Sequence, residues 1–132
     1  MSEIDDIHVE NCFGCSQSNP IGLRIRFTVK DETALGEFIS NENHEGPPGF
    51  VHGGIIGAVI DESFSFLARS LVNEGVRTAK QEIKFRKPVK LGETIYVESR
   101  LKEQKRGAII VTSKVYTNTN FIAEATGMLF KV

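Results

Sequence analysis

The sequence has little of several things that commonly mark a functional class. It contains two cysteines and no tryptophan in 132 residues, and its formal net charge is only −1. A nearly neutral chain has no general attraction to nucleic acid or to a membrane surface. No apolar run approaches the roughly 20 residues that a membrane-spanning helix needs. The N-terminal stretch is acidic and lacks the apolar core of a secretory signal, so we expect a cytoplasmic protein.

Both cysteines lie in one short motif, Cys12-Phe13-Gly14-Cys15. A structural zinc site usually has four ligands, and although His8 could supply a third, no fourth lies nearby in the sequence. A thioredoxin-like redox motif would need a βαβ context, which this part of the chain does not offer. We therefore expect reduced thiols in a structural lead segment, and neither a metal nor a redox cofactor.

One stretch has the periodicity of a long amphipathic helix. Its apolar residues recur at about 100° per residue and cover one half of the cylinder. They are Ile55, Ile56, Val59, Ile60, Phe64, Phe66, Leu67 and Leu71. Asn73-Glu74-Gly75 is a stop signal, so we expect a helix over residues 55–72.

The start and the middle of this helix are both unusual. It opens with His52-Gly53-Gly54 rather than with a Ser, Thr, Asp or Asn cap, and glycines there leave backbone N–H groups accessible. Asp61 lies in mid-helix, away from the first turn where the helix dipole would favour a carboxylate. Together these features suggest a donor for a developing oxyanion and, separately, a base or nucleophile.

The spacing of these two features predicts an oligomer. His52 and Asp61 are nine residues apart, which at about 1.5 Å per residue places them roughly 13 Å apart along the axis. One helix therefore cannot bring both to a single reacting atom. Two such helices packed antiparallel about a two-fold axis can, so we expect a homodimer with two shared sites.

The rest of the chain alternates apolar and polar residues as half-buried strands do. We expect strands over residues 23–30, 33–40, 77–87, 95–101, 108–116 and 121–132, after an irregular lead segment over residues 1–21. The resulting order, β-β-α-β-β-β-β, forms one domain over residues 1–132. A largely apolar helix with five or six antiparallel strands predicts an α+β fold in which a curved sheet wraps around the helix. In residues 77–87, alternation puts Ala79, Gln81, Ile83 and Phe85 on one face and Thr78 on the other.

The segment from Gly49 through His52-Gly53-Gly54 to Asp61 resembles the signature of hot-dog-fold acyl-CoA thioesterases. This is the superfamily of 4-hydroxybenzoyl-CoA and phenylacetyl-CoA thioesterases. The resemblance continues through Thr78–Pro88 and Leu91-Gly92-Glu93, and Cys12–Leu23 is similar to the opening of one branch of the family. It covers most of the chain. It implies the hot-dog fold and hydrolysis of an acyl- or aryl-CoA to a carboxylic acid and CoA.

The resemblance also implies roles for individual residues. Asp61 would attack the thioester or activate water, and the N–H of Gly53 on the partner helix would polarise the thioester carbonyl. The Thr78 hydroxyl would position the water or the carboxylate. His52 would be structural or would hydrogen-bond near the thioester. Gly54 is the neighbouring substrate-binding candidate, and the sequence does not separate it firmly from Gly53 as the oxyanion donor.

One departure from the family pattern concerns the second oxyanion donor. Several relatives carry an Asn or Gln a few residues before the His-Gly-Gly, where this sequence has Gly46. His52, Asn43 or a water could act in its place. Glu62 lies about 100° around the helix from Asp61, and we expect it to be a solvated or salt-bridged neighbour.

Basic residues gather after the helix, at Lys84, Arg86 and Lys87. They are either a solvated strand face, on which lysine protects a sheet edge, or a seat for the phosphates of CoA.

Two other functions remain open on the same fold. A non-catalytic hot-dog module could bind acyl-CoA as a sensor, although a pure binder has no use for a carboxylate such as Asp61 at the thioester. A dehydratase or hydratase is less favoured, because the acid stands in the thioesterase position. The acyl group, and the choice between a dimer and a dimer of dimers, are not determined by the sequence.

Overall fold

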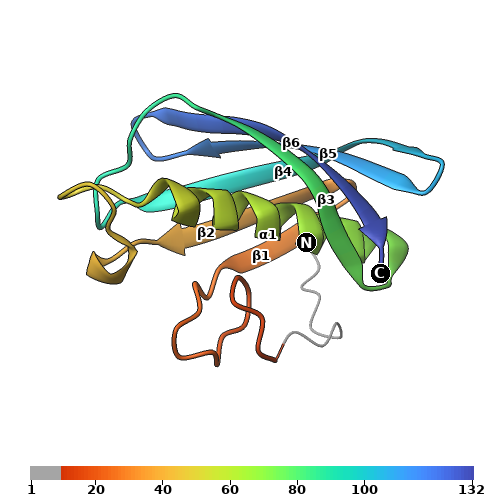
Figure 1. Ribbon diagram of the computed structural model, residues 1–132, viewed down its shortest axis with the longest axis horizontal. Coiled ribbons are helices and arrows are strands. Elements are labelled where there is room, and N and C mark those ends of the chain that lie inside the picture. The colour runs from red at the N-terminus through yellow and green to blue at the C-terminus, as the bar shows by residue number, and fades with distance from the viewer. Residues whose placement is uncertain (1–9) are drawn as a thin grey trace.

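A long helix lies along the inner face of a curved sheet (Figure 1). The computed structural model describes residues 10–132. The elements are β1 (Arg26–Lys30), β2 (Thr33–Ile39), the 3-10 helix η1 (Glu42–His44), α1 (Gly53–Val72), β3 (Val76–Phe85), β4 (Thr94–Lys105), β5 (Ala108–Tyr116) and β6 (Phe121–Lys131). The strands are antiparallel in the order β1-β2-β4-β5-β6-β3. This confirms the predicted fold class and element order.

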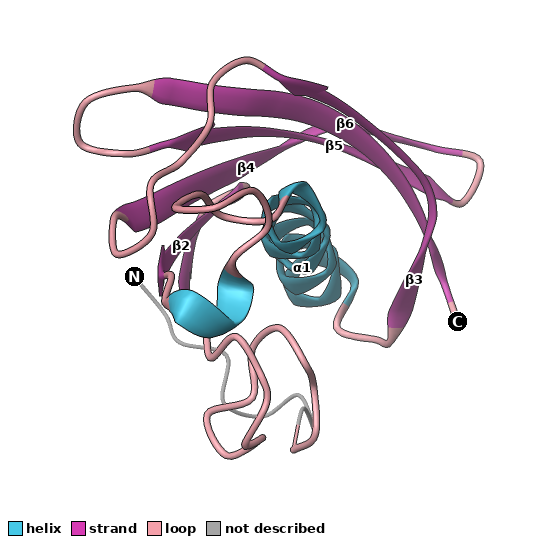
Figure 2. Cartoon of the chain, turned by 60° about the vertical axis from the view of Figure 1, so that its left-hand side comes forward, coloured by secondary structure: helices cyan, strands magenta, loops and turns pink. Residues whose placement is uncertain are grey.

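The core fills the space between α1 and the concave face of the sheet, which Figure 2 shows arching over the helix. Val59, Ile60, Phe64 and Leu67 are completely buried, as the helical periodicity predicted. Gly127 on β6 lets the sheet approach, because a Cβ there would lie 2.6 Å from the Phe64 ring. No helix in residues 10–132 is long and apolar enough to cross a membrane.

The described part of the lead segment, residues 10–21, packs under α1, on the side that the sheet leaves open (Figure 2). Its backbone accepts hydrogen bonds at Phe13 O from Leu23 N (2.7 Å) and at Gly14 O from Ile25 N (2.9 Å). The strand predicted from residue 23 therefore begins only at Arg26. The reason is Arg24, whose φ of 54° interrupts the extended backbone.

The hairpin between β4 and β5 is tighter than the sequence indicated. Strand β4 runs on to Lys105, past its predicted end at residue 101, so only Arg106 and Gly107 remain to connect it to β5. Both have positive φ, 52° and 85°, as the two central residues of a type I′ hairpin turn require.

Candidate active site

The first turn of α1 is capped by a histidine. Nδ1 of His52 accepts a hydrogen bond from the backbone N–H of Gly54 at 2.8 Å. The helix has no Ser, Thr, Asp or Asn cap, and the imidazole does what such a side chain usually does. A Cβ on Gly54 would lie 2.9 Å from the ring, so this position must stay bare for the cap to form.

The same contact distinguishes the two glycines. The N–H of Gly54 is occupied by His52, whereas the N–H of Gly53 has no hydrogen-bond partner among residues 10–132. A Cβ added to Gly53 would meet no atom within 4 Å, so the space in front of it is open. Gly53 is thus an exposed donor at the positive end of the helix dipole, which is suited to an anionic oxygen.

Asp61 lies eight residues after Gly53, a little over two turns further along α1, on the side that faces β3. Its Oδ1 accepts a hydrogen bond of 2.6 Å from Oγ1 of Thr78. Both side chains are partly buried, so the carboxylate is held in one orientation and is still open to solvent or a ligand. The structure therefore brings Asp61 and Thr78 together.

An irregularity in β3 makes this contact possible. The register against β6 shifts between Thr78 and Lys80, which leaves Ala79 as an extra residue. Regular alternation placed Thr78 and Gln81 on opposite faces. The assignment was wrong for Thr78, because the bulge brings its side chain to the α1 side, where Gln81 also lies.

Gln81 is a residue of this region that the sequence did not single out. Its Nε2 donates to the carbonyl oxygen of Gly57 at 3.2 Å. Its Oε1 is buried and has no hydrogen-bond partner among the described residues. Alternation placed Gln81 on one face with Ile83, and the structure agrees, since both side chains lie beside Gly57 of α1. Nothing in the sequence marked Gln81 as part of the site.

Glu62 points away from Asp61, toward the lead segment. It is buried, it pairs with Arg69 at 3.3 Å, and Sγ of Cys12 donates to its Oε1 at 3.4 Å. Of the two expected alternatives, a solvated or a salt-bridged carboxylate, the structure confirms the salt bridge. Because Arg69 and the lead segment cover it, Glu62 is not placed to substitute for Asp61.

Gly46 has a packing role that explains the departure from the family pattern. A Cβ there would lie 2.8 Å from the Cα of His52, so no side chain fits. Its N–H donates to Phe50 O at 2.9 Å, which closes the loop before α1. The bare Gly46 thus keeps the His52 backbone close to the preceding loop.

The basic residues have partners of their own on the surface. Arg86 Nη2 donates to Oε1 of Glu124 at 2.7 Å, and Lys87 Nζ donates to Oδ1 of Asn120 at 3.3 Å. These contacts join the end of β3 to the start of β6. Lys84 is exposed on the outer face of the sheet. Within residues 10–132, no hydrogen bond or ion pair joins them to Asp61.

The lead-segment cysteines are free thiols that lie against α1. Burial, and then the neighbouring Glu62, raises the pKa of the Cys15 thiol. His8, which the sequence suggested as a further ligand, lies outside the described residues.

Comparisons with known proteins agree with this geometry. A family model described as "Thioesterase superfamily" matches residues 48–120. Acyl-coenzyme A thioesterase THEM4 of Xenopus laevis is 33% identical over 91 residues, which cover 67% of this chain but only 40% of THEM4. A candidate esterase of Saccharolobus solfataricus is 32% identical over 111 residues, covering 83% of this chain and 73% of that protein.

A solved structure confirms the hot-dog fold. It is a hypothetical thioesterase of Streptococcus pneumoniae with coenzyme A, which superposes with a TM-score of 0.77 at 16% identity. The match covers 82% of this chain and 88% of that one.

Proposed function

The chain belongs to the thioesterase superfamily, and we propose that it hydrolyses an acyl- or aryl-CoA thioester to a carboxylic acid and CoA. The observation that carries the proposal is the Asp61 carboxylate, held by the Thr78 hydroxyl at 2.6 Å on the side of the helix that faces β3. The coenzyme A in the related S. pneumoniae structure and the name of THEM4 support the choice of CoA thioesters.

The chemistry needs a nucleophile and a donor for the developing charge. Asp61 either attacks the thioester carbon directly or takes a proton from a water that attacks it. The oxyanion that forms is stabilised by the free N–H of Gly53, which is not shared with an internal acceptor. Collapse of the tetrahedral intermediate expels the CoA thiolate, and the acid is released directly or after hydrolysis of an acyl-Asp61 anhydride.

Two chains are needed to assemble one such site. Gly53 and Asp61 lie eight residues apart on one helix, which is roughly 12 Å along its axis. Among the strands of residues 10–132, β3 pairs only with β6, so its outer edge can meet a second copy of the chain. A homodimer joined along this edge would place α1 of one protomer beside α1 of the other, with the Gly53 of one near the Asp61 of its partner.

Sedimentation tests the shared site. We expect the active species to have the mass of a dimer or of a dimer of dimers. A monomer that is stable and fully active would contradict the shared site.

The central test compares Asp61→Asn with the wild type. Asparagine keeps the size of the side chain and loses its charge and basicity, so kcat should fall by about 10²-fold or more, the lower end of what a positioned base supplies. KM and the melting temperature should change little. Asp31→Asn, the same change in the exposed turn between β1 and β2, is the matched control and should keep wild-type kcat.

The readout is release of free thiol from a panel of acyl-CoA chain lengths and aryl-CoAs. Wild-type protein that binds these ligands without releasing thiol would support the sensor function instead. Asp61→Asn protein that retains most of its activity would show that the carboxylate is not catalytic.

A further inference from the structure

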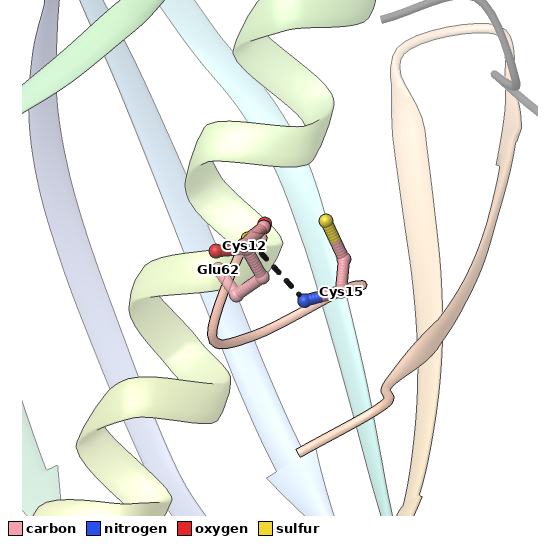
Figure 3. Close-up of side chains that lie close together, drawn as sticks. All are labelled: Cys12, Cys15 and Glu62. Carbon is pink, nitrogen blue, oxygen red and sulfur yellow. Dashed lines mark hydrogen bonds between the residues drawn. The ribbon is translucent and has the colours of Figure 1, made fainter. Parts of the chain in front are cut away.

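Three metal-ligating side chains from two distant parts of the chain meet beneath α1. Cys12 and Cys15 come from the lead segment and Glu62 from the middle of α1 (Figure 3). The two Sγ atoms and a carboxylate oxygen all lie within 4.8 Å of one another. The sequence suggested too few ligands for a metal, because nothing in it shows that Glu62 joins a motif fifty residues away.

The distances suit a tetrahedral zinc ion. Bonds of about 2.3 Å to sulfur and 2.0 Å to oxygen place S and O about 3.5 Å apart, and two sulfurs about 3.8 Å apart. The Sγ of Cys12 and the Oε1 of Glu62 are 3.4 Å apart. A pair at the 4.8 Å limit would have to close by about 1.0 Å if it is the two sulfurs and by about 1.3 Å if it is a sulfur and the oxygen.

Hydrogen bonds and close packing against α1 hold the loop that carries Cys12 and Cys15. The backbone N–H of Cys15 points at the Sγ of Cys12 at 3.4 Å, and such N–H donors stabilise a sulfur that carries negative charge. A Cβ on Gly14 would lie 2.5 Å from Cγ of Glu62, so only glycine lets the loop touch the helix here. The Gly14 carbonyl is further fixed by Ile25 N, and Ser16 N donates to Cys12 O at 3.1 Å.

The charges around the cluster also balance. Two thiolates and one carboxylate carry −3, and a divalent cation reduces this to −1. The guanidinium of Arg69 supplies the remaining positive charge, with Nη2 at 3.3 Å from Glu62 and 3.7 Å from the Sγ of Cys15. Cys15 and Glu62 are buried, and a buried charged cluster persists only if it is paired in this way.

We propose that Cys12, Cys15 and Glu62 bind a thiophilic divalent cation, with Zn²⁺ the expected ion. Thiolate sulfur combined with a carboxylate oxygen is a donor set that zinc accepts, and a water would complete the tetrahedron. Binding deprotonates the two thiols and so releases two protons as two S–Zn bonds and one O–Zn bond form. The ion joins the lead segment to α1, on the side of the helix away from Asp61, and takes no part in thioester hydrolysis.

The test measures metal in the purified chain. Protein kept reduced by a phosphine is incubated with Zn²⁺, passed through a desalting column and analysed by elemental mass spectrometry. We expect about one zinc per chain, with a higher melting temperature than after chelator treatment. Replacement of zinc by Co²⁺ should give the near-ultraviolet absorption of thiolate-to-cobalt charge transfer.

Variants assign the ligands. Cys12→Ser and Cys15→Ser should each weaken zinc binding by about 100-fold or more, and Glu62→Gln by at least about 10-fold, since even outer partners of a metal ligand are worth that much. Asp61→Asn, the adjacent carboxylate on the other side of the helix, is the matched control and should still bind about one zinc.

The proposal is overturned if the wild-type protein retains no zinc. It is also overturned if the double variant Cys12→Ser, Cys15→Ser retains zinc as well as the wild type does. If the variants do not fold, chelator competition and the cobalt spectrum of the wild type still decide the question. A wild-type cobalt spectrum without thiolate bands would equally refute it. None of these outcomes depends on thioesterase activity.

Discussion

The hydroxyl of Thr78 offers a sharp test of how the Asp61 carboxylate is positioned. Thr78→Val keeps the size and the β-branched shape of the side chain and removes only the donor of the 2.6 Å hydrogen bond. Thr78 does not touch the substrate in this mechanism, so it acts as a positioning residue. The substitution should therefore change kcat much more than KM.

The magnitude follows from the kind of bond that is lost. A hydrogen bond to a charged partner contributes about 1.5–3 kcal/mol net, which corresponds to roughly 10- to 150-fold in rate. Asp61 is only partly buried, so water can replace part of this interaction. We therefore expect kcat to fall toward the lower end of that range, by about 10-fold.

The assay is steady-state thiol release by wild type, Thr78→Val and Thr78→Ser. Serine keeps the donor, so this matched variant should retain most of the wild-type kcat, with unchanged thermal unfolding in all three. The reasoning is refuted if the valine variant has wild-type kcat. It is also refuted if serine is as damaging as valine, because the effect would then come from packing.

Three further predictions concern the surroundings of the site. His52→Ala removes the cap on Gly54 and should destabilise the protein by about 1 kcal/mol, whereas His52→Asn should largely restore it; thermal unfolding measures both. Burial lowers the pKa of His44 below its usual 6.5, so the unfolded state binds more protons at this residue than the folded state does. The free energy of unfolding should therefore decrease as pH falls below about 6.5. Urea unfolding at several pH values measures this, and a His44→Gln variant with the same pH slope as the wild type would contradict it. If Arg86 and Lys87 contact CoA phosphates, Arg86→Ala combined with Lys87→Ala should raise KM at constant kcat, and less so at high salt; an unchanged KM would assign them to the solvated strand face.

Much of the fold was predictable because it depends on local periodicity. The apolar stripe from Ile55 to Leu71 predicts a helix that packs along one side against the rest of the protein. The observed α1, over residues 53–72, agrees with this prediction. The period-two alternation likewise located all six strands. Their ends were less certain, because the positive φ of Arg24 and of Arg106 depends on backbone contacts that periodicity does not report.

The catalytic candidates were predictable for a similar reason. Asp61 is conspicuous in the sequence because its carboxylate lies in mid-helix, away from the first turn where the helix dipole would favour it. The glycines at residues 53 and 54 are conspicuous because they follow no Ser, Thr, Asp or Asn cap. Choosing between those glycines required the structure. The bond from Gly54 to His52 is a matter of one side-chain rotamer, which no pattern of residue types specifies.

Only the tertiary structure determined which residues meet. The bulge at Ala79 turns Thr78 toward Asp61, and regular alternation in the sequence indicated the opposite face. Glu62 joins Cys12 and Cys15 because the lead segment folds back under α1, a contact across some fifty residues. Periodicity describes how a segment presents its own faces, whereas such meetings depend on how distant segments pack, and the same local pattern is compatible with many packings.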